Sequence, residues 1–277
     1  MTEEKYPELR VTAKTPEEAF RRLMNVIELL RKECPWDKEQ DHKSLRVCML
    51  EEAYEVADAI DNDDMDNLKE ELGDVLLQVV FHTSLASEAD NFAMTDVIND
   101  ECEKMIRRHP HIFSQESAKT VDKVLEKWEN VKRGEKGETT QLQRLKSVPR
   151  ALPALTRGYK VQKRAADVGF DWDDVSGAFD KLREETTELI DAYGSSDRAA
   201  ITEEVGDLLF SVVNVARFLD VDPEYALTQT SDKFIRRFGY IEEQAASMGL
   251  KPENMTLAEM DALWNEAKEL ERAGAKK

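Results

Sequence analysis

Two acidic motifs occur twice along this chain, and their spacing limits the folds that it can adopt. The later copy reads Glu184-Glu185-x-x-Glu188 and then Glu203-Glu204-Val205-Gly206-Asp207, and the earlier copy reads Glu51-Glu52-x-x-Glu55 and then Glu70-Glu71-Leu72-Gly73-Asp74. Acids three residues apart lie on one face of a helix. Two such helices side by side would bring four carboxylates together, and the repeated spacing predicts a duplicated metal site rather than a solvated acidic face.

Apolar residues follow the same stretch with a helical period: Ile201, Val205, Leu208, Leu209, Val212, Ala216 and Leu219. They predict a helix whose apolar side faces a core. Glu204, Asp207, Ser211 and Asn214 form a polar strip beside this stripe, where a core-lining helix would bring them to a cleft. Gly206 lies in mid-helix, where glycine costs about 1 kcal/mol relative to alanine. We therefore expect another group to approach the helix closely at this glycine.

The composition favours a helical protein and excludes several classes. Charged residues make up 35% of the chain, and only 11 glycines and 8 prolines interrupt it. A net charge of −19 argues against nucleic-acid binding, because phosphate backbones are held by clustered lysine and arginine. We find no membrane-spanning apolar run and no signal peptide at the amino terminus, and we expect a cytoplasmic protein. The three cysteines form no C-x-x-C pair and predict neither disulfides nor a zinc site.

Helical periodicity and capping residues place the other elements. Helices are expected at about 15–32, 43–61, 65–88, 94–108, 118–132 and 256–273. The polar segment 133–141 is the predicted linker, so that residues 1–141 form a first domain and residues 142–277 a second. Trp36, in the break between the first two helices, is expected to anchor the core.

Basic clusters follow each acidic pair. The first half carries Lys104, Arg108 and a Trp128-x-x-x-Lys132 pair, and the second half carries Lys233, Arg236, Arg237 and a Trp264-x-x-x-Lys268 pair. A terminal basic cluster ordinarily complements the helix dipole, and a tryptophan at helical spacing is more often core than a stacking platform. Because the patterns repeat in register, we interpret the cations as a phosphate clamp.

The donor types narrow the chemistry further. Carboxylates without histidine or cysteine suit Mg²⁺, with Mn²⁺ as a substitute. The chain has no P-loop, no G-x-S-x-G and no G-x-G-x-x-G. A di-iron carboxylate oxidase would need Glu-x-x-His ligands, which the four histidines do not supply. A catalytically silent module that binds nucleotides stays open as an alternative.

With these motifs, the chain resembles the MazG-type nucleoside triphosphate pyrophosphohydrolases. The resemblance rests also on Cys34-Pro35-Trp36-Asp37-Lys38-Glu39-Gln40, Arg108-His109-Pro110-His111-Ile112-Phe113 and Val168-Gly169-Phe170-Asp171-Trp172. It implies an all-α tandem repeat of two MazG folds with antiparallel four-helix cores, a homodimer, and Mg²⁺-dependent hydrolysis of nucleoside triphosphates between the α- and β-phosphates. It implies metal ligands at Glu185, Glu188, Glu204 and Asp207, with a second, less certain set at Glu52, Glu55, Glu71 and Asp74. It also places phosphate-facing cations at Lys233 and Arg237, and Trp264 and Lys268 near the base and phosphates.

The two halves are expected to be unequal, with catalysis in the second. Aligned on Glu-x-Gly-Asp, Asn214 falls opposite Phe81. An asparagine amide could hold a water or a substrate hydroxyl, whereas a phenylalanine would more naturally fill a core. Glu184 is our first choice for the group that positions or deprotonates the attacking water.

Overall fold

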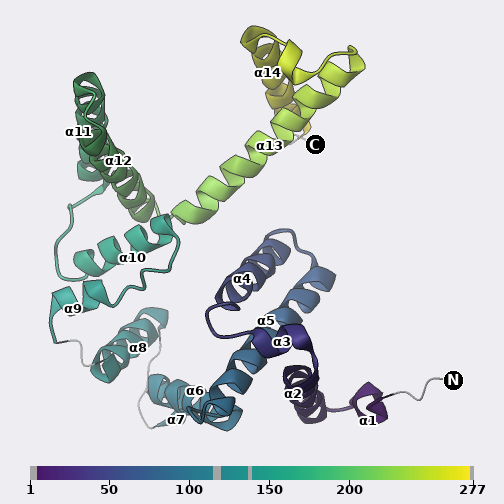
Figure 1. The fold of residues 1–277 in the computed structure, drawn as a ribbon. Coiled ribbons are helices and arrows are strands. Elements are labelled where there is room, and N and C mark those ends of the chain that lie inside the picture. The colour runs from purple at the N-terminus through teal and green to yellow at the C-terminus, as the bar shows by residue number, and fades with distance from the viewer. Residues whose placement is uncertain (1–4, 115–119, 137–138, 275–277) are drawn as a thin grey trace. The chain divides into compact units, whose positions relative to one another are not determined.

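A computed structural model describes residues 5–114, 120–136 and 139–274, and within these ranges every regular element is a helix (Figure 1). The predicted all-α class is confirmed. None of the described helices has the length and the apolar character that crossing a membrane requires. The first elements are α1 Pro7–Arg10, α2 Pro16–Glu33, α3 Pro35–Glu39, α4 Arg46–Asp61, α5 Met65–Glu88, α6 Met94–Arg108, α7 Pro110–Phe113 and α8 Val121–Lys136. The later elements are α9 Gln141–Lys146, α10 Ala154–Ala166, α11 Val175–Ser195, α12 Arg198–Phe218, α13 Pro223–Ser247, the 3₁₀ turn η1 Pro252–Asn254 and α14 Leu257–Gly274.

The chain divides into two compact units, residues 1–135 and 136–277. Each unit is built around one long antiparallel hairpin, α4 with α5 in the first and α11 with α12 in the second (Figure 1). A second hairpin follows in the later unit, where α14 packs on α13. The segment predicted as a linker, 133–141, is helical at its start, because α8 continues to Lys136.

Capping residues explain where several helices begin. Thr15 and Glu18 form a capping box at the start of α2, and the Asp64 side chain accepts a hydrogen bond from the amide of Asn67 at the start of α5. The predicted start at residue 43 is wrong by a turn. There the Asp41 carboxylate accepts hydrogen bonds from the amides of Lys43 and Ser44 at 2.8 and 2.7 Å, and this local turn delays α4 until Arg46.

The core of the first unit lies between α2, α5 and the start of α6. Its buried members are Ile27, Leu45, Val80, Phe81, Leu85 and Met94. Phe81 is only 4% exposed, as its predicted packing role requires. Trp36 does not join this cluster, because it is 60% exposed on the short helix α3. The expectation that Trp36 anchors the core is therefore wrong.

The apolar stripe on α12 is only partly covered within the chain. Val205, Leu209 and Val212 are 41%, 49% and 44% exposed, although the stripe was expected to face a core. The predicted close approach at Gly206 is also wrong for the single chain, because an added Cβ atom there would meet no atom within 4 Å. A hairpin of two helices buries only one side of each helix, so the stripe needs a further partner.

Candidate functional site

The acidic motifs of the second unit meet in the α11–α12 hairpin. Helix α11 presents Glu185 and Glu188 one turn apart, and α12 presents Glu204 from the opposite side. One carboxylate oxygen from each of the three lies within 4.8 Å of the others. Asp207 lies outside this group of three. We call Glu185, Glu188, Glu204 and the adjacent Asp207 the second-unit cage.

Burial and mutual repulsion perturb these acids. The pKa of Glu204 is raised above its ordinary value, first by desolvation and then by the negative charges of Glu188, Glu185 and Asp207. The pKa of Glu188 is raised by desolvation and by the charge of Glu185. Asp207 therefore contributes to the raised pKa of Glu204, although it lies outside the close group of Glu185, Glu188 and Glu204. A cation placed among these groups would relieve the repulsion.

Glu185 provides the clearest test of whether a metal ion fits. Its side chain is 4% exposed, and its Oε2 atom is buried without a hydrogen-bond partner. A buried carboxylate oxygen without a partner is costly, and coordination to a cation would satisfy it. The other oxygen, Oε1, lies 2.6 Å from the ammonium of Lys181. The oxygen-only donor set and the unpartnered atom fit a hard divalent cation.

Sequence reasoning missed Lys181. Its ammonium also donates to Glu184 Oε1 at 2.8 Å, and these two carboxylates raise the pKa of Lys181 above its ordinary value. Glu184, our predicted general base, is thus paired with a lysine. The i to i+4 spacing from Lys181 to Glu185 was visible in the sequence and would have predicted this contact.

Glu204→Gln should leave the melting temperature of the metal-free protein unchanged or raise it. The raised pKa of Glu204 means that its charge destabilises the folded state above that pKa. The difference should disappear as the pH falls below the ordinary glutamate pKa, where both wild-type states are protonated. Glu185→Gln should instead lower the melting temperature, because Lys181 loses one of its two partners. Scanning calorimetry in EDTA across pH measures both, and a marked fall for Glu204→Gln would contradict the cage.

The first unit gathers the corresponding acids. Glu52, Glu55 and Glu71 each offer an oxygen within 4.8 Å of the others, and Asp74 again lies outside the tight group. The pKa of Glu52 is raised by desolvation and then by Asp74 and Glu55, while a hydrogen bond from the buried Gln78 acts in the opposite direction. The pKa of Glu71 is raised in the same way, by desolvation and by Glu55. We call these four acids the first-unit cage.

The two cages differ in one prominent cation. Aligned on Glu52 and Glu185, the position of Lys181 is occupied by Cys48 in the first unit. The described part of the first unit shows no ion pair to its cage acids. The duplicated acids are therefore set in different electrostatic surroundings.

The predicted clamp residues lie on α13 and α14. The Arg237 guanidinium lies 5.3 Å over the ring of Trp264 and forms an ion pair with Glu271, a residue that sequence reasoning missed. Arg236 also contacts Glu271, at 3.4 Å. Lys233 and Lys268 are partly exposed and form no ion pair within the described residues.

The structure does not bring this clamp to the cage within one chain. Helix α13 packs on α14, on α10 and on the end of α12, whereas α11 packs mainly along α12 (Figure 1). Across the described residues, no hydrogen bond or ion pair joins Lys233, Arg236 or Arg237 to a cage acid. The first unit repeats the clamp with Arg107, Arg108 and Trp128, while the side chain of the predicted Lys132 lies outside the described residues.

Asn214 is buried, but its carbonyl is already engaged. Its Oδ1 accepts a hydrogen bond from Arg217 Nε at 2.9 Å, and Arg217 forms an ion pair with Asp171 at 2.5 Å. The amide group and the second lone pair of Oδ1 remain for a water or a substrate hydroxyl. Its predicted role in the site therefore stays a prediction.

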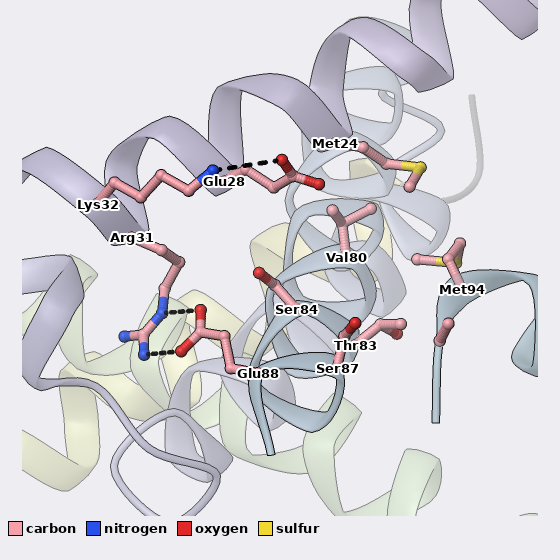
Figure 2. A pocket seen from close by; sticks show the side chains of 11 residues that line it. Met24, Glu28, Arg31, Lys32, Val80, Thr83, Ser84, Ser87, Glu88 and Met94 are labelled. Atoms are coloured by element: carbon pink, nitrogen blue, oxygen red, sulfur yellow. Dashed lines mark hydrogen bonds and ion pairs between the residues drawn. The ribbon is translucent and has the colours of Figure 1, made fainter. Parts of the chain in front are cut away.

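A pocket in the first unit lies apart from all the predicted site residues (Figure 2). It has a volume of about 520 Å³ and lies between α2, α5 and the start of α6, with Met24, Val80 and Met94 on its apolar side. Two cations line it: Arg31 is paired with Glu88 at 2.6 Å and also donates to main-chain carbonyls, and Lys32 lies 3.8 Å from Glu28. The pocket thus offers no unsatisfied arginine for an anionic ligand.

Two helical units that each gather carboxylates in a central hairpin define a class of all-α proteins whose carboxylate clusters could hold a divalent cation. Residues 40–113 and 176–240 match the MazG nucleotide pyrophosphohydrolase domain. The chain therefore belongs to the MazG family and is a hydrolase, as the sequence resemblance indicated.

Similar proteins cover nearly the whole chain. It is 43% identical over 251 residues to the nucleoside triphosphate pyrophosphohydrolase/pyrophosphatase MazG of Thermotoga maritima, covering 90% of this chain and 95% of that protein. It is 42% identical over 255 residues to the nucleoside triphosphate pyrophosphohydrolase of Escherichia coli K12, covering 90% and 97%. A solved structure, of a mazG-related protein from Thermotoga maritima, aligns with 41% of this chain and 98% of its own, with a TM-score of 0.37 and 27% identity.

Proposed function

We propose that this protein hydrolyses nucleoside triphosphates between the α- and β-phosphates, with Mg²⁺ held by the second-unit cage. Mn²⁺ would substitute, since it shares the preference for oxygen ligands. The observation that carries this proposal is the group of Glu185, Glu188 and Glu204, in which a buried oxygen of Glu185 has no partner. The names of the similar proteins support the substrate class.

The residues divide the chemistry between them. Glu185, Glu188, Glu204 and Asp207 would hold the cation, which supplies Lewis acidity toward the phosphates and toward water when it is bound. Glu184 would orient or deprotonate the attacking water, and its Oε1 accepts a hydrogen bond from Lys181. Lys233, Arg236, Arg237 and Lys268 offset the negative charge of the leaving pyrophosphate, and Trp264 offers a ring for the base. The buried Asn214 amide would hold a substrate hydroxyl.

We propose that the protein acts as a homodimer in which each site uses two chains. Within one chain the clamp on α13 and α14 makes no polar contact with the cage among the described residues. The exposed apolar residues of α12 offer the surface on which a second copy would pack. A dimer with twofold symmetry would then place the clamp of one chain beside the cage of the other.

We assign catalysis to the second unit, residues 142–277 in the sequence-based division, and a structural or weakly active role to residues 1–141. Phe81 fills the core of the first unit where the second unit has Asn214. Cys48 replaces Lys181 beside the cage. These differences support unequal units although the acids are duplicated.

Incubation with a nucleoside triphosphate and Mg²⁺ should yield the nucleoside monophosphate and pyrophosphate. The reason is that the cage and the clamp together would bind the phosphates on both sides of the bond between the α- and β-phosphates. Ion-exchange chromatography of the products, with phosphate detection before and after added pyrophosphatase, measures this outcome. Release of the diphosphate and orthophosphate would contradict the proposed cleavage position. Intact nucleotide binding without any turnover would favour the catalytically silent module.

A further inference from the structure

The basic clusters of the two units share a contact that their sequence does not reveal. In the second unit, Arg237 donates through Nε and Nη2 to Glu271 Oε2 at 3.0 and 2.7 Å. In the first unit, Arg108 donates through the same two atoms to Glu135 Oε2 at 2.9 and 2.5 Å. Each of these arginines also lies 5.3 Å over a tryptophan ring, Trp264 or Trp128. A duplicated arginine, glutamate and tryptophan cluster thus links α13 to α14 and α6 to α8.

The second arginine of each cluster is where the two units differ. Arg107 donates through Nε and Nη2 to Glu135 Oε1 at 3.0 and 2.8 Å, so both arginines of the first unit are held by one carboxylate. Arg236 makes one contact with Glu271 Oε1, at 3.4 Å, and is 62% exposed. In the second unit, one arginine is therefore fixed and the other is available to an anion.

The fixed arginine can offer a phosphate the Nη1 side of its guanidinium, because Nε and Nη2 donate to Glu271. Arg237 is 14% exposed, its Nε and Nη2 edge is occupied by a carboxylate, and one face of its guanidinium covers Trp264. A phosphate could bind that edge only by displacing Glu271, whose pKa is lowered by Arg237. Phe234 packs on the same indole with its ring centre at 5.1 Å. The orientation of Trp264 is consequently set by Phe234 and by the held guanidinium together.

We propose that Glu271 is a positioning residue of the phosphate clamp, which holds Arg237 against Trp264 and leaves the Nη1 side of Arg237, together with Arg236 and Lys233, to bind the phosphates. This inference rests on the proposed function. It also assigns to Arg236 the binding of the substrate phosphates.

The test compares Glu271→Gln with Glu135→Gln, which removes the same charge from the same kind of contact in the first unit. Glu271→Gln should raise the KM for nucleoside triphosphate about tenfold and change kcat less than about twofold, since one charge-assisted contact supports the clamp. Glu135→Gln should leave KM unchanged. Glu271→Asp should recover part of the loss, because the charge is kept. Arg236→Gln should raise KM at least as much as Glu271→Gln.

A purely structural ion pair would give another pattern. In that case both glutamine variants would lower the melting temperature alike and neither would change KM, which would overturn the inference. A lower KM in Glu271→Gln would overturn it too, because it would mean that Glu271 competes with the phosphates for Arg237.

Binding of pyrophosphate in EDTA, measured by calorimetry, separates this inference from the proposed reaction. Weaker binding by Glu271→Gln than by wild type supports the clamp even if the wild type hydrolyses no triphosphate. Equal binding by the two proteins, with normal wild-type turnover, would reject the role of Glu271 alone.

Discussion

Glu204→Gln should lose more than about 100-fold of its pyrophosphate release, whereas Glu71→Gln should keep at least about half. Removing partners of metal ligands already costs 10- to 100-fold in many metal sites, so losing a ligand should cost more. Glu204 stands in a cage where Lys181 contacts Glu185, and Asn214 lies further along the same helix, α12. Glu71 stands in the first-unit cage, and there Cys48 and Phe81 occupy the sequence positions that align with Lys181 and Asn214.

The two variants form a matched pair because each removes one charge from a group of three acids. The pKa of both glutamates is raised by desolvation and by neighbouring acids, so neither amide should harm the empty fold. Turnover is measured at saturating Mg²⁺, with melting temperatures as the control. Comparable losses in both variants, or survival of activity in Glu204→Gln, would show that the first unit contributes catalysis.

Local sequence signals were sufficient for several helices. The predicted ranges 65–88 and 94–108 agree with α5 and α6 because period and caps both lie within the segment itself. The pairing of Glu52 with Glu71 and of Glu185 with Glu204 could be predicted for a similar reason. Equal spacing in a repeat leaves a hairpin as the simplest arrangement.

Contacts between distant helices could not be predicted in the same way. Glu271 lies far from Arg237 in sequence, and nothing in the local pattern distinguishes it from the other acids of α14. The exposure of Val205 and Leu209 was missed because periodicity identifies an apolar face but not the chain that covers it. Trp36 was misplaced because large aromatic residues are usually buried. This tryptophan lies on the short helix α3 and is mostly exposed.

Because clamp and cage make no polar contact within one chain among the described residues, we expect two inactive variants to restore activity when they share a dimer. Glu204→Gln, which lacks a working cage, and Lys233→Ala/Arg236→Ala, which lacks a working clamp, should each be inactive alone. If the proposed homodimer forms, coexpression with different tags and purification through both tags yields mixed dimers. Each mixed dimer should contain one site made from the intact cage of one chain and the intact clamp of the other.

The mixed dimers should therefore recover about half of the wild-type turnover, one of two symmetric sites being complete. If cage and clamp of the same chain worked together, each chain of the mixed dimer would carry one lesion in its own site and activity would stay at background. A mixed dimer of Glu204→Gln with Asp207→Asn is the control, because both cages are then damaged and no arrangement restores a site. Size-exclusion chromatography with light scattering confirms that dimers are being compared. Recovery with the first pair but not with the control would require the clamp to act across the dimer, as we propose from the exposed stripe of α12 on the hairpin that holds the cage.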